Sequence, residues 1–144
     1  LDRQQTGCRL SLNIAPFVPK AGTPFQWLSM TQPSILNRRL SLLKNNLSPQ
    51  GIKVKSESPA WSQVQGVLAR GDIKLAEVLA SMEKISLAGW RKAAEKCHLD
   101  VDYYSHQRWD TSQKLPWAIL DSGTKPEHLE VELNRALAQP TSTS

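Results

Sequence analysis

With 144 residues the chain is long enough for one domain with a modest hydrophobic core, and 40% apolar with 22% charged residues is ordinary for a globular fold. No apolar run approaches the roughly 20 residues that cross a bilayer, and no signal-like leader opens the sequence. These features exclude a membrane-spanning protein of the usual helical kind, and we expect a cytoplasmic one. The net charge of +5 comes from residues 1–60, where basic residues far outnumber acidic ones.

The N-terminal excess of positive charge has two interpretations. It suits a surface that contacts RNA or another anion. Basic residues scattered over solvated faces give the same composition, and that arrangement is the commoner one. The residues concerned are Arg3, Arg9, Lys20, Arg38, Arg39, Lys44, Lys53 and Lys55.

Residues 9–58 predict a strand, a helix and a second strand. Apolar residues alternate in residues 9–17 (RLSLNIAPF), which is typical of a strand with one polar face, and Pro16 predicts the end of pairing. From Ser34, four leucines recur at helical spacing: Leu36, Leu40, Leu43 and Leu47. Ile52 and Val54 then alternate with charged residues. Because units of this length cross over between parallel strands, we expect the two strands to be parallel.

Residues 61–97 predict three short helices, with breaks near Gly71 and Ser86. Gly71 suits the left-handed position that follows a helix, and Asp72 suits the N-cap of the next one. Cys97 continues a helical apolar stripe, so we expect a buried, reduced thiol there.

The C-terminal part is irregular through Leu115-Pro116-Trp117 and then predicts a helix from about Lys125 to Ala138. The tail, residues 139–144 (QPTSTS), consists of small and polar residues with nothing to bury. We expect this tail to be disordered.

Common catalytic and cofactor motifs are absent from the sequence. It contains no GxxxxGK[ST], GxSxG, HExxH, CxxC or CxxxCxxC pattern. The three histidines lie too far apart along the chain to predict a metal cluster, and the carboxylates lie in polar stretches that do not predict burial. From the residues alone we therefore assign no catalytic residue and no metal ligand.

Three blocks, in order along the chain, resemble one family. Residues 17–27 (FVPKAGTPFQW) resemble the FVPKPHTPFQW signature of radical S-adenosylmethionine proteins that often carry an N-terminal cobalamin-binding domain. Residues 68–72 (LARGD) resemble the LxRGD segment of that family. Its closing pattern is similar to Leu115-Pro116-Trp117, Asp121, Gly123, Leu129 and Glu132. One departure is Ala21-Gly22, where the family has Pro-His; the form is closer to the PGTP loop of the related methylthiotransferases, so no role of that histidine is carried over.

The resemblance implies a place within a larger enzyme. In this superfamily a partial (β/α) barrel holds a [4Fe–4S] cluster on a CxxxCxxC loop, and S-adenosylmethionine binds the unique iron. Because this chain lacks CxxxCxxC and begins with Leu1, we expect a C-terminal fragment that carries no cofactor of its own and is inactive alone. The parent enzyme is expected to use the [4Fe–4S] cluster and S-adenosylmethionine. Many proteins of this family also carry a cobalamin-binding domain, and the sequence does not decide whether the parent enzyme uses cobalamin.

The expected fold is α+β. The resemblance implies that residues 1–58 form the terminal βαβ part of the barrel and that residues 59–138 form a helical C-terminal extension. The partner of the chain would then be the rest of that barrel. The loop after the first strand would lie at the barrel mouth, where α/β barrels bind ligands.

Five residues of this loop are candidates for the site. By analogy with last-strand contacts in the superfamily, Phe17, Val18 and Pro19 are expected to form a wall near the adenine of S-adenosylmethionine; the alternative is that they only close the barrel core. Lys20 and Thr23 are candidates for substrate access, against the alternatives of a solvated lysine and a turn-forming hydroxyl.

Outside the loop, Arg70 and Asp72 are expected to hold helix ends, and Trp117 is expected to dock against the missing barrel. The alternative function, from another class, is a non-catalytic module that docks RNA or a partner protein through its basic N-terminal part.

Overall fold

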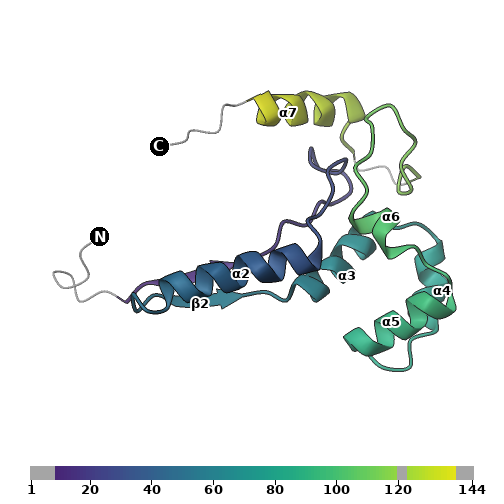
Figure 1. The fold of residues 1–144 in the computed structure, drawn as a ribbon. Helices are drawn as coiled ribbons and strands as arrows, with labels where there is room; N and C mark the ends of the chain where they lie inside the picture. The colour runs from purple at the N-terminus through teal and green to yellow at the C-terminus, as the bar shows by residue number, and fades with distance from the viewer. Residues whose placement is uncertain (1–8, 120–122, 139–144) are drawn as a thin grey trace.

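The computed structural model describes residues 9–119 and 123–138 (Figure 1). This part is α+β, as expected, with one two-stranded sheet and six helices. The elements, in chain order, are β1 (Ser11–Ile14), α2 (Pro33–Leu47), β2 (Lys53–Ser56), α3 (Pro59–Arg70), α4 (Lys74–Ala80), α5 (Leu87–Lys96), α6 (Val101–Ser105) and α7 (Pro126–Ala138). None of these helices is both long and apolar enough to span a membrane. The tail expected to be disordered, residues 139–144, lies outside the described residues.

The β1–α2–β2 unit forms an extended arm of the molecule (Figure 1). Its strands pair in parallel, as predicted, with Ser11 opposite Lys53 and Ile14 opposite Ser56. β1 is shorter than the predicted strand and ends before Pro16, which has no N–H to donate to a ladder. The helix runs antiparallel to the strands and packs against β2.

α2 forms where the leucine stripe predicts it, and Pro33 occupies the first turn, where a missing N–H costs nothing. Leu40 is the one residue of α2 that is buried. A sheet of two strands is too narrow to cover the whole apolar face of a helix, so the other leucines of the stripe keep more contact with solvent.

Helices α3 to α6 pack around one hydrophobic core. The three helices predicted in residues 61–97 are α3, α4 and α5, and α6 was not predicted. Fully buried members of this core are Val64, Val67, Leu75, Val78, Trp90, Ala93, Ala94 and Tyr104. Cys97 lies at the edge of this core, half-buried and reduced, where complete burial was expected.

The prediction for Gly71 is wrong. Its φ of −79° and ψ of 176° are extended, not left-handed. A glycine is needed for another reason, since a Cβ there would collide with the side chain of Leu75. Asp72 is not the N-cap residue of α4, which is Ile73, although its carboxylate accepts a hydrogen bond from the Lys74 N–H at the start of that helix (3.0 Å).

A second cluster, which we call the tryptophan cluster, joins segments far apart in the sequence. It comprises Trp27, Trp109, Trp117, Leu129 and Leu133. α7 supplies the two leucines and lies across the top of the molecule in Figure 1. The loop after β1 therefore belongs, by packing, with the C-terminal segments rather than with the sheet.

Candidate functional site

The loop of residues 17–27 leaves the carboxyl end of β1 and carries all five candidate residues. Phe17 is 49% exposed and meets the half-exposed Phe25 edge to face, with ring centres 5.9 Å apart. Val18 is half-buried and Pro19 is fully buried. Of the three residues assigned to the cofactor, Phe17 is thus the one with an exposed side chain, whereas Pro19 supports the loop from within.

Lys20 and Thr23 lie in one tight turn of the loop. The Thr23 hydroxyl donates to the carbonyl of Lys20 (2.7 Å), and the Thr23 N–H contacts the same oxygen. Gly22, between them, has a φ of 71°, which a side chain would disfavour. The Lys20 side chain is exposed. The hydroxyl therefore has a structural partner, and the ammonium group of Lys20 is the polar group that this turn presents to solvent.

Gln26 ties the turn to the C-terminal part of the chain. Its side chain is buried, and its Oε1 accepts hydrogen bonds from the Gly22 N–H (3.0 Å) and from Trp117 Nε1 (2.8 Å). The buried amide oxygen therefore has two hydrogen-bond donors, one from the turn and one from the C-terminal part of the chain.

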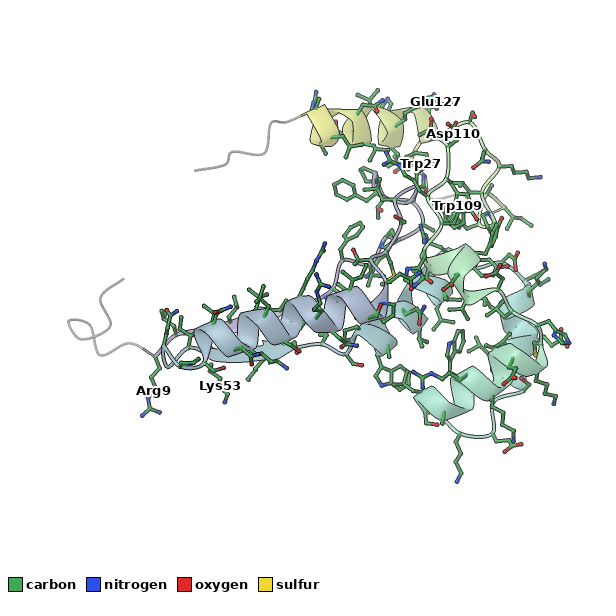
Figure 2. All side chains as sticks on the ribbon, viewed as in Figure 1. Arg9, Trp27, Lys53, Trp109, Asp110 and Glu127 are labelled. Carbon is green, nitrogen blue, oxygen red and sulfur yellow. The ribbon has the colours of Figure 1, made fainter. Side chains whose placement is uncertain are left out.

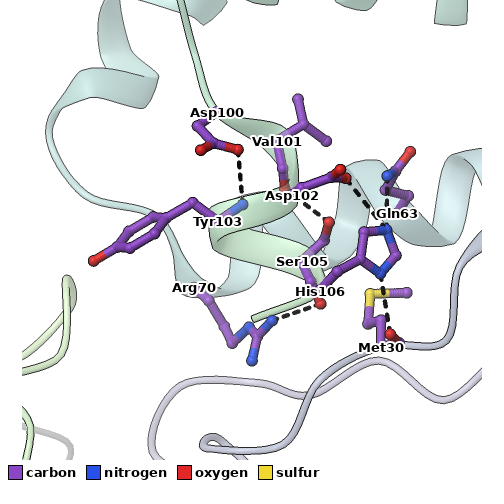
Figure 3. Close-up of polar contacts among 9 residues, drawn as sticks. All are labelled: Met30, Gln63, Arg70, Asp100, Val101, Asp102, Tyr103, Ser105 and His106. Carbon is purple, nitrogen blue, oxygen red and sulfur yellow. Dashed lines mark hydrogen bonds and ion pairs between the residues drawn. The ribbon is translucent and has the colours of Figure 1, made fainter. Parts of the chain in front are cut away.

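Arg70, the last residue of α3, holds the other side of the loop. Its side chain is 0% exposed. Nη1 donates to the carbonyls of Gln26 (3.2 Å) and Leu28 (2.6 Å), and Nη2 donates to the carbonyl of Ser105 (2.7 Å; Figure 3). Burial lowers the pKa of Arg70 to about 10, so the guanidinium is still charged at neutral pH.

The guanidinium also stacks on an aromatic ring. Arg70 Cζ lies 4.5 Å from the centre of the Trp109 ring, a favourable cation–π distance. Trp109 packs edge to face on Trp117, with 5.1 Å between the ring centres. The backbone N–H of Trp109 donates to the carbonyl of Trp27 (2.9 Å). One buried cation therefore joins α3, the loop, α6 and the segment that follows α6.

Residues from all three sequence blocks meet at this point. Gln26 and Trp27 come from the first block, Arg70 from the second and Trp117 from the third. The expectation that Arg70 holds a helix end is met in part, because the guanidinium bonds the carbonyl of Ser105, the last residue of α6, but it also bonds the carbonyls of Gln26 and Leu28. The expectation for Trp117 is wrong, since it is buried within this chain and cannot anchor a missing barrel. We call the contacts among Gln26, Trp27, Arg70 and Trp117 the hub. The sequence signal for the hub was the occurrence of the three blocks in one chain, whereas the spacing of the blocks along the chain did not predict that they touch.

A second set of polar contacts fixes α6 against α3 (Figure 3). His106 Nδ1 contacts the Met30 carbonyl (3.0 Å), and His106 Nε2 contacts the Gln63 side chain (2.9 Å) and lies 3.7 Å from Asp102. Nearby, Tyr104 donates its hydroxyl proton to Asp72 (3.0 Å). Burial and the neighbouring Asp72 raise the pKa of Tyr104, so its hydroxyl stays protonated. His106, Asp72 and Asp102 therefore have structural partners within the chain.

The described residues contain no group of three or more His, Cys, Asp or Glu side chains close enough to hold a metal ion. Comparison with protein families, characterised proteins and solved structures gives no match. The arrangement is a rigid loop with an exposed aromatic pair and one free lysine at the end of a parallel strand. Such a loop can shape and line a binding site, whereas the residues around it supply no nucleophile–base pair.

Proposed function

We propose that the chain is the C-terminal portion of a radical S-adenosylmethionine iron–sulfur enzyme, in which it completes the barrel and shapes substrate access. The support comes from the family resemblance of the three blocks together with the parallel β1–α2–β2 unit, which is the kind of unit from which α/β barrels are built.

The free edge of β1 carries this proposal. The carbonyls of Leu10 and Ile14 accept hydrogen bonds from β2, so the backbone groups of Ser11 and Asn13 point to the opposite edge. In the part of the chain that the structure describes, no strand pairs with that edge. An unpaired, unprotected edge next to a parallel partner is what a strand of an interrupted barrel would present.

Apolar side chains of β1 and α2 are also uncovered. Leu10 and Leu12 lie on the α2 side of the sheet, yet remain 42% and 39% exposed. On α2, Ile35 and Leu42 are seven residues apart and therefore share one side of the helix, and Leu42 is 63% exposed. A further strand and helix packed beside β1 and α2 would bury this surface, as neighbouring units do in an α/β barrel.

The loop supports the second half of the proposal. It lies just beyond the carboxyl end of β1, the end at which such barrels bind ligands. Arg70 and Gln26 hold it in one conformation before any ligand arrives, which lowers the entropy lost on binding. Within the proposed barrel, Phe17 would face the adenine of S-adenosylmethionine and Lys20 the substrate.

The residues present do not fit a [4Fe–4S] cluster. The sequence has two cysteines, Cys8 and Cys97, whereas such a cluster takes three or four thiolates. Cys97 follows the last residue of α5, and its sulfur is 3.5 Å from the hydroxyl of Ser81, which follows α4. Under the proposal the cluster ligands therefore belong to another part of the polypeptide. Adenine fits better, because Phe17 and Phe25 are partly exposed aromatic rings on which a planar base can pack.

The RNA-docking alternative is less well supported. Helical periodicity places Arg38 and Lys44 on different sides of α2, and strand alternation places Lys53 on the far side of the sheet. The described basic residues of the N-terminal part, from Arg9 onward, thus do not form one continuous surface for a polyanionic backbone.

Anaerobic reconstitution tests the proposal. The intact native protein should take up about four iron ions per chain and give the Mössbauer spectrum of a [4Fe–4S] cluster, while residues 1–144 alone should yield no stable cluster. A native protein that folds, contains this segment and holds no iron would refute the proposed function.

A further inference from the structure

The face of the sheet that α2 leaves uncovered is basic. Side chains alternate between the two faces of a strand, and Ile52 and Val54 lie toward α2. Arg9, Lys53 and Lys55 therefore lie on the opposite face. Figure 2 shows Arg9 and Lys53 pointing away from α2 at the amino end of the sheet. We call these three residues the basic sheet face.

The pairing register of β1 and β2 places these three cations near one another. Lys53 and Lys55 are two residues apart on β2, which separates their Cα atoms by roughly 6.6 Å. Lys53 donates its backbone N–H to the carbonyl of Leu10, next to Arg9, on a strand about 4.8 Å away. Three positive groups thus share one small area.

None of these three residues forms an ion pair with another described residue; the ion pairs of the described residues join Lys92 to Glu83, His106 to Asp102 and Arg135 to Glu132. Glu57 lies on the same face, two residues from Lys55, and offsets part of the charge of Lys55. The positive charge is therefore least compensated at Arg9 and Lys53. The remaining neighbours are hydrogen-bonding side chains, with Ser11 opposite Lys53 and Asn13 opposite Lys55.

We propose that the basic sheet face binds a small molecule that carries two or more phosphate groups. Cations that repel one another at this spacing are stabilised by an anion that bridges them. The Ser11 hydroxyl and the Asn13 amide would add hydrogen bonds to its oxygens. A small molecule is favoured over a polynucleotide because the face spans two strands of four residues, and the other basic residues of this region, on α2, point elsewhere.

This site is separate from the loop of residues 17–27. Arg9 and Lys53 lie at the amino ends of the strands, whereas the loop leaves the carboxyl end of β1. In an α/β barrel the helices cover the outside of the sheet, so within the proposed barrel this face would line the interior near the amino ends of the strands. Pyrophosphate binding and iron content are measured separately, so the failure of one proposal can be told from the failure of the other.

Titration of the ¹⁵N-labelled intact native protein with inorganic pyrophosphate at about 0.02 M salt, where surface charges are weakly screened, tests the inference. We expect saturable shifts confined to the amides of residues 9–13 and 53–57. The double variant Lys53→Gln/Lys55→Gln should weaken binding about tenfold or more. The matched control, Lys74→Gln/Lys114→Gln, removes the same charge from exposed positions in other segments and should bind as the unchanged chain does.

Two results would overturn the inference. Equal weakening in both double variants, or shifts spread over α2 and α4, would mean that pyrophosphate senses only the net charge. A single-stranded oligonucleotide that shifts the same amides at a concentration at least tenfold lower than pyrophosphate would assign the face to nucleic acid instead. An unchanged pattern of amide shifts in the unliganded variants establishes that each is folded.

Discussion

Arg70 stacks on Trp109 while donating hydrogen bonds to three backbone carbonyls, with Cζ 4.5 Å from the ring centre. No acidic side chain pairs with this cation in the described part of the chain. The charge is instead stabilised by carbonyl dipoles and by the face of an aromatic ring. Because those carbonyls belong to the loop and to α6, the loop conformation depends on Arg70.

Replacing Arg70 should therefore be strongly destabilising. Arg70→Met leaves three carbonyls without their donors and should lower the free energy of unfolding by about 3 kcal/mol or more. Arg70→Lys keeps the charge but cannot reach all three oxygens, so it should fall between Arg70→Met and the unchanged chain. Arg108→Met, at a nearby exposed position, should change the value by less than about 0.5 kcal/mol. Urea unfolding measures all three, and an Arg70→Met midpoint equal to that of the control would contradict the role given to Arg70.

The bond between Gln26 and Trp117 can be measured by a double-mutant cycle. Gln26→Met and Trp117→Phe should each destabilise the chain by about 1–3 kcal/mol, since each leaves a buried polar partner unpaired or removes packing. The coupling energy should be about 1 kcal/mol. The control pair is Gln26→Met and Trp61→Phe. Because Trp61 lies at the opposite end of α3 from Arg70, the effects of these two substitutions on the free energy of unfolding should add. Additivity of both pairs would show that the bond does not connect the loop to the C-terminal part.

Because the pKa of Tyr104 is raised in the folded state, we expect its contribution to the free energy of unfolding to decrease at alkaline pH. Burial and Asp72 hold its pKa above the ordinary value of about 10 in the folded state, whereas the unfolded chain releases the proton near that value. Above about pH 10 the tyrosine therefore holds fewer protons in the unfolded state than in the folded state, and the contribution of Tyr104 to the free energy of unfolding should fall with a slope approaching 1.4 kcal/mol per pH unit. Below pH 10 the contribution is complete.

Tyr104→Phe should remove this part of the pH dependence, and Tyr103→Phe, at an exposed position, should not. Arg70 acts with the opposite sign, because its lowered pKa favours the folded state as the pH rises, but its contribution is common to all the chains and cancels in the comparison. Urea midpoints at pH 8 and pH 11 are sufficient. Identical slopes for both variants would disprove the assignment to Tyr104.

Loop and scaffold substitutions should separate in the intact enzyme. Lys20→Ala should lower turnover while iron content and the unfolding midpoint stay constant, since the side chain is exposed. Thr23→Val removes the bond to the Lys20 carbonyl and should also lower turnover, by loosening the turn. Leu40→Ala removes a buried side chain and should cost roughly 2–3 kcal/mol of stability, with activity lost only as the protein unfolds. Normal turnover of both loop variants would limit the loop to a structural role.

Local patterns in the sequence predicted most of the elements. The leucine stripe of α2, the alternation around Val54 and the breaks near Gly71 and Ser86 each act over a few residues, so α2, β2 and the division into α3, α4 and α5 could be predicted. The hub could not. Arg70 reaches Leu28 and Ser105 across more than 30 residues of sequence, and neither periodicity nor composition reports such a contact. The docking role expected for Trp117 failed for the same reason, because its partner Gln26 lies 91 residues away.

The central claim is that this chain is the C-terminal part of a longer radical S-adenosylmethionine enzyme, and the coding sequence upstream of Leu1 tests it most directly. Sequencing of the full transcript, checked by the intact mass of the native protein, gives the answer. The proposal predicts an open reading frame that continues upstream into barrel strands and a CxxxCxxC motif. A start codon immediately before Leu1, or an upstream domain without that cysteine triad, would contradict it.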